Sequence, residues 1–150
     1  IEQVVCHLPK NPKQRYAGTL DLYADVHGVP TIVDFKSSKA LYPGNRVQIA
    51  AYMNALRSMG HGEEPQQGMV VRLSKDASNP GYEVQTVKLE EVPALMDVFY
   101  ALLHVWHWKH PKRIPNDSGI EKAVLRGQTC GGVTVWDTHR MGASALVCRI

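Results

Sequence analysis

Residues 18–37 alternate apolar and polar side chains on either side of His27-Gly28, in the stretch GTLDLYADVHGVPTIVDFKS. A two-residue connection containing glycine between two alternating segments is typical of a β-hairpin. If His27 and Gly28 form the turn, facing residues have numbers that sum to 55, so Asp21 lies opposite Asp34. The register predicts one apolar face and one face that carries two carboxylates and a lysine.

Continued outward, the same register pairs Thr19 with Lys36 and Leu20 with Phe35. Opposed side chains have Cβ atoms about 5 Å apart, and two carboxylates at that distance repel each other unless a positive charge lies between them. Lys36 supplies one charge, and a divalent cation such as Mg²⁺ would supply more while keeping several waters. The alternative is a solvated strand face with a simple salt bridge.

The rest of the chain predicts one α/β (α+β) domain with a mixed central sheet flanked by helices. The expected elements are a strand at 1–8, a loop at 9–15, a helix at 45–60 that ends on a glycine, strands at 67–75 and 81–89, and a helix at 90–108. We assign 1–115 to the core and 116–150 to a C-terminal extension packed on the same domain. Its segments 118–127, 131–140 and 144–150 are expected as a short helix and two strands.

The composition indicates the location of the protein, the state of its cysteines and its affinity for charged partners. The chain has no apolar run of membrane-spanning length and no signal-like start, which favours a soluble, intracellular protein. Its three cysteines, Cys6, Cys130 and Cys148, are odd in number and widely spaced, so we expect free thiols. The net charge of +3 would tolerate a polyanion without arguing for one.

Three short motifs follow one another in order: GTLD at 18–21, DFK at 34–36 and QIAAY at 48–52. Gln48 and Tyr52 in the last motif are four residues apart, so they project from one face of the expected helix. This combination resembles the RecB-like branch of the PD-(D/E)XK nuclease superfamily, including phage-type exonucleases. The resemblance implies a restriction-endonuclease-like αβββαβ core and covers roughly residues 1–75.

The resemblance also implies an activity, namely Mg²⁺- or Mn²⁺-dependent hydrolysis of phosphodiester bonds in DNA during repair or recombination. It implies a cytoplasmic location in a bacterium or a phage-infected cell. It makes Asp21, Asp34 and Lys36 the catalytic set, with metal ligands from the two aspartates and the backbone carbonyl of Phe35. Gln48 and Tyr52 match the supporting pair of the family.

Two cations, Lys39 and Arg46, flank this set in sequence and are candidates for contacts with DNA. Solvated loop charges explain them equally well. A second copy of the chain or a partner protein of a recombination complex is a further possible binding partner.

The sequence also departs from the family pattern. Many relatives carry another acidic residue or histidine on a helix before the first motif, whereas Glu2 is the only acidic residue there. Either the first helix lies outside this sequence or the catalytic set is incomplete, with Glu2 as a lesser metal ligand. Three scattered cysteines cannot hold the four-cysteine iron–sulfur cluster of some relatives, so we expect none. A DNA- or partner-binding module without cleavage therefore remains an alternative.

One further segment, HVWHWKHPKR at 104–113, mixes histidines, tryptophans and cations. It is either a helix end with one tryptophan packed on the core, which we favour, or an edge that stacks on bases and binds phosphates.

Overall fold

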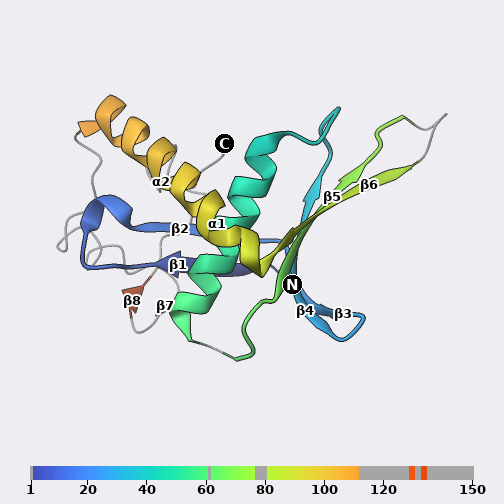
Figure 1. Ribbon diagram of the computed structural model, residues 1–150, viewed down its shortest axis with the longest axis horizontal. Helices are drawn as coiled ribbons and strands as arrows, with labels where there is room; N and C mark the ends of the chain where they lie inside the picture. Colours follow the sequence, from blue (N-terminus) through green and yellow to red (C-terminus); the bar gives the residue numbers. More distant parts are fainter. Residues whose placement is uncertain (1, 61, 77–80, 112–128, 131–132, 135–150) are drawn as a thin grey trace.

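The computed structural model describes residues 2–60, 62–76, 81–111, 129–130 and 133–134 (Figure 1). Its strands are β1 (Gln3–His7), β2 (Tyr16–Leu20), β3 (Leu22–Val26), β4 (Val29–Lys36), β5 (Gln67–Leu73), β6 (Tyr82–Lys88), β7 (Thr129–Cys130) and β8 (Val133–Thr134). Its helices are α1 (Pro43–Met59) and α2 (Val92–Lys109), with short 3-10 turns η1 (Pro12–Gln14) and η2 (Leu89–Glu91).

The main sheet has the strand order β3-β4-β5-β6. β4 and β5 are parallel, whereas β3 and β6 are antiparallel to their neighbours, which confirms the expected mixed sheet. β1 and β2 form a separate antiparallel pair. Parallel neighbours need a crossover connection, and α1 provides it between β4 and β5.

The predicted hairpin is confirmed at its tip. His27 and Gly28 have φ angles of 55° and 80°, as a two-residue turn with both residues left-handed requires. The Gly28 N–H donates to the Asp25 carboxylate at 2.7 Å. Pairs from Leu22–Val33 to Val26–Val29 follow the expected register.

At its open end the predicted hairpin is wrong, because the first strand breaks at Asp21 into β2 and β3. The expected pairs Thr19–Lys36 and Leu20–Phe35 do not form, since Thr19 pairs with Val4 and Leu20 with Gln3 in β1. A strand that changes partners must bend, and Asp21 is the residue at the bend. Asp21 therefore lies outside both ladders.

The helix α1 covers one face of the main sheet (Figure 1). It begins with Pro43, whose missing N–H is no loss in a first turn, and ends before Gly60 at φ 64°, the left-handed conformation that glycine favours. At Gly68 of β5 a Cβ would lie 2.5 Å from Cγ1 of Ile49, so the absent side chain lets helix and sheet approach closely.

The second helix, α2, lies against α1 and completes the hydrophobic core. Its buried side chains are Val92, Met96, Phe99, Leu103 and His107. Pro93 lies in its first turn, as expected, and the Phe99 ring packs against Tyr16 of β2 with centroids 4.6 Å apart. Neither α2 nor any other helix in the described part of the chain has the length and apolarity to cross a membrane.

Cys6 in β1 is disulfide-bonded, so the expectation of free thiols is wrong for this residue. β8 falls within the strand expected at 131–140. The helix expected at 118–127 and the strand expected at 144–150 lie outside the described residues.

Candidate functional site

Asp21 and β4 meet where the β3–β4 ladder ends. The Asp21 carboxylate accepts a hydrogen bond from the Phe35 N–H at 2.7 Å, in place of a backbone partner. Because the N–H and C=O of one strand residue face the same neighbouring strand, the Phe35 carbonyl is directed to the side of Asp21. The bend thus brings a carboxylate and a backbone carbonyl to the same edge of the sheet.

Asp34 and Lys36 lie two residues apart on β4, so they share the face that α1 covers. Asp34 is only 5% exposed, and its Oδ2 lies 2.7 Å from the Lys36 ammonium. Within the described residues this ion pair is the one polar contact of that oxygen. A buried carboxylate oxygen with so few partners is costly unless another positive charge completes its surroundings.

The pKa of Asp34 agrees with this shortage of partners around its carboxylate. Burial raises the pKa of Asp34, and the Asp21 carboxylate raises it further, while the ion pair with Lys36 opposes both effects. The net direction is upward, so the surroundings of Asp34 disfavour its charged form despite the lysine. The two aspartates therefore act on each other electrostatically, as the sequence predicted, although they do not face each other in a ladder.

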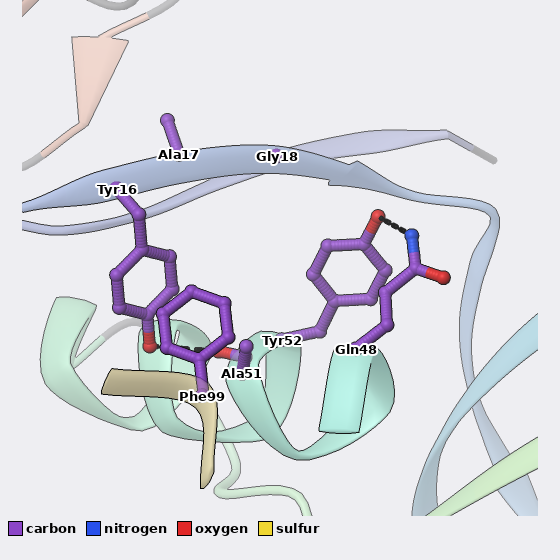
Figure 2. Close-up of a pocket in the computed structure, with 7 residues that line it drawn as sticks. All are labelled: Tyr16, Ala17, Gly18, Gln48, Ala51, Tyr52 and Phe99. Carbon is purple, nitrogen blue, oxygen red and sulfur yellow. Dashed lines mark hydrogen bonds between the residues drawn. The ribbon is translucent and has the colours of Figure 1, made fainter. Parts of the chain in front are cut away.

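Lys36 is held by a chain of polar contacts to α1. Its ammonium donates to Oε1 of Gln48 at 2.8 Å. Nε2 of Gln48 in turn donates to the Tyr52 hydroxyl at 2.9 Å (Figure 2). Gln48 and Tyr52 are both buried. The structure thus brings together the four polar side chains predicted from β4 and α1.

Gly18 of the first motif explains why β2 can pass over this helix. A Cβ at Gly18 would lie 2.7 Å from Cε1 of Tyr52, closer than side chains tolerate. Figure 2 shows the Tyr52 ring beneath this strand. The cavity there, of about 10 Å³, is no larger than one water needs, so it is not a substrate pocket. Sequence reasoning missed this packing role, although the glycine itself was the signal.

The remaining candidates are less closely tied to the site. Lys39 is exposed. Arg46 forms an ion pair with Glu91, a partner that sequence reasoning missed because 45 positions separate the two residues. Glu2 is exposed, and the β1–β2 register, continued by one residue, would place it opposite Asp21.

The donor set can be tested against a divalent cation. Among the residues that the structure describes, no three His, Cys, Asp or Glu side chains lie close enough together to share a metal ion. Mg²⁺ is nevertheless often bound through one or two carboxylates, with waters completing its coordination. Asp21, the under-partnered oxygen of Asp34 and the Phe35 carbonyl fit that pattern.

Comparison of the chain with models of known protein families and with curated proteins gives no match. The functional inference therefore depends on the side chains and their geometry.

Proposed function

We propose that this chain is a Mg²⁺- or Mn²⁺-dependent deoxyribonuclease of the PD-(D/E)XK type. The observation that supports it best is the linked set from Asp34 through Lys36 and Gln48 to Tyr52, with Asp21 at its edge. The order β2, β3, β4, α1, β5 is compatible with the βββαβ part of that core. Exonuclease action in phage or bacterial DNA processing is the finer form of the proposal and depends on family analogy.

In this proposal Asp21 and Asp34 hold the cation, with the Phe35 carbonyl as a further ligand. A bound divalent ion lowers the pKa of a water and polarises a phosphoryl oxygen. Lys36 directs its ammonium at the charge that builds on the phosphate, where a preorganised donor is most effective. Gln48, held by Tyr52, fixes the position of that ammonium.

A binding module without cleavage is the second candidate. It is favoured by the Lys36 ammonium, which already neutralises Asp34, and by the absence of a third acidic ligand near the pair among the described residues. Such a module would bind DNA equally well in EDTA.

The test is cleavage of end-labelled single- and double-stranded linear DNA with Mg²⁺, Mn²⁺ or EDTA. Metal-dependent products should appear with the wild type and disappear in Asp34→Ala and Lys36→Ala. The matched controls are Asp97→Ala and Lys75→Ala, which change exposed residues of the same types elsewhere. Folded wild-type protein that cuts with neither metal would refute the nuclease proposal and leave the binding module.

A further inference from the structure

A second polar surface lies where η1 packs against the C-terminal part of α2. It consists of the exposed side chains of Lys10, Lys13, His104, Trp108 and Lys109, and we name it the basic-aromatic surface. The two segments are joined by buried His107, whose Nε2 lies 3.1 Å from the Lys13 carbonyl oxygen. The fold thus unites the cations before β2 with the aromatic segment almost a hundred residues later.

The charged groups that affect the pKa of His107, at the contact of η1 with α2, are both basic. Burial lowers the pKa of His107, the hydrogen bond to the Lys13 carbonyl opposes this, and the nearby charges of Lys13 and His104 lower the pKa further. A concentration of positive charge from two segments attracts phosphate groups and releases their counterions.

The two tryptophans of α2 differ in their surroundings. Trp106 is partly buried and stacks on His110, with ring centroids 4.6 Å apart. Trp108 is 76% exposed and is followed in sequence by exposed Lys109. Unpaired bases stack on exposed aromatic rings, since every base presents a π-face, and cations on the same part of the surface bind the phosphates of the strand.

β2 connects this surface to the candidate site along the chain. The strand begins directly after Arg15, the C-cap of η1, and ends at Leu20, next to Asp21. The η1 side of the basic-aromatic surface and the candidate site therefore lie at opposite ends of one strand.

We propose that the basic-aromatic surface binds a single-stranded segment of the DNA substrate away from the bond that is cut. This inference depends on the proposed nuclease function and adds to it a preference for an unpaired strand. Trp108 stacks on a base, and Lys13 and Lys109 bind phosphates on either side of it.

The experiment is fluorescence anisotropy of a labelled thymidine oligonucleotide of twelve nucleotides, in EDTA so that nothing is cut. Trp108→Ala should weaken its binding about tenfold. Lys13→Ala and Lys109→Ala should each reduce the slope of log K against log salt by about 0.7.

Two surface variants serve as matched controls: Tyr82→Ala removes an aromatic ring that is 73% exposed on β6, and Lys75→Ala removes an exposed lysine. Neither should change affinity. Equal affinities for Trp108→Ala and Tyr82→Ala, or tighter binding of duplex than of single strands, would overturn the inference.

Its failure can be distinguished from failure of the nuclease proposal. If wild type cleaves DNA but Trp108→Ala binds as tightly as wild type, the surface is not a substrate contact and the nuclease stands. If no metal supports cleavage but Trp108→Ala still loses affinity, the surface binds single strands and the nuclease proposal falls.

Discussion

Asp34 carries a carboxylate in surroundings that disfavour its charge, and this has a measurable effect on stability. The pKa of Asp34 in the folded state is higher than its ordinary value of 3.8. At a pH between the ordinary and the raised pKa, the folded protein therefore binds the proton more tightly than the unfolded chain does. Stability therefore falls as pH rises through that window. At neutral pH the charged form of Asp34 therefore destabilises the folded state.

Asp34→Asn should consequently stabilise the protein at neutral pH without added metal, by on the order of 1 kcal/mol, because the amide resembles the protonated acid. The gain should disappear at a pH below about 3.8, where both forms are neutral. Urea unfolding in EDTA across this pH range measures it. A loss of stability at pH 7 would show that the ion pair with Lys36 outweighs burial.

In the proposed nuclease, Gln48 would act through Lys36 as a positioning residue. Gln48→Ala removes the acceptor of the 2.8 Å contact and should lower kcat about tenfold to a hundredfold with little change in KM. Gln48→Glu keeps an acceptor and should restore most of the activity. If both variants lose activity in proportion to their loss of urea stability, Gln48 has only a structural role.

At the scale of elements, β2 and α1 are fitted to each other through Gly18 and Tyr52. Gly18→Ala should destabilise the protein by about 1–3 kcal/mol, because its Cβ would meet the ring at 2.7 Å. In the Tyr52→Ala background the same substitution should cost much less. A double-mutant cycle by chemical denaturation measures this coupling, and additive effects would contradict direct packing.

The contact of η1 with α2 should depend on pH. Burial lowers the pKa of His107 below its ordinary 6.5, so the neutral ring stabilises the fold above that value, and this contribution is lost as pH falls. His107→Gln should make stability less steeply dependent on pH between about 7.5 and 5. Thermal unfolding at several pH values tests this, with His27→Asn, at the exposed tip of the hairpin, as the control.

For the molecule as a whole, local patterns predicted local structure. The His27-Gly28 turn, the end of α1 at Gly60 and the Gln48–Tyr52 pair were predictable, because each depends on residues close in sequence. The bend at Asp21 was not, since it arises from pairing of β2 with β1. The Arg46–Glu91 pair and the disulfide of Cys6 likewise depend on contacts over long separations.

Two contacts of the candidate site bridge similar lengths of chain, 12 residues from Lys36 to Gln48 and 14 from Asp21 to Phe35. Loops of such similar length lose nearly the same entropy when they close. During refolding, the Lys36–Gln48 and Asp21–Phe35 contacts should therefore form together, and affinity for divalent cations should appear with the helix. Stopped-flow refolding with Mn²⁺ would show this as metal binding that coincides with helix formation, and metal binding that lags behind the helix would contradict it. If the chain is the proposed nuclease, its metal site would then be complete only when strand, hairpin and helix are all in place.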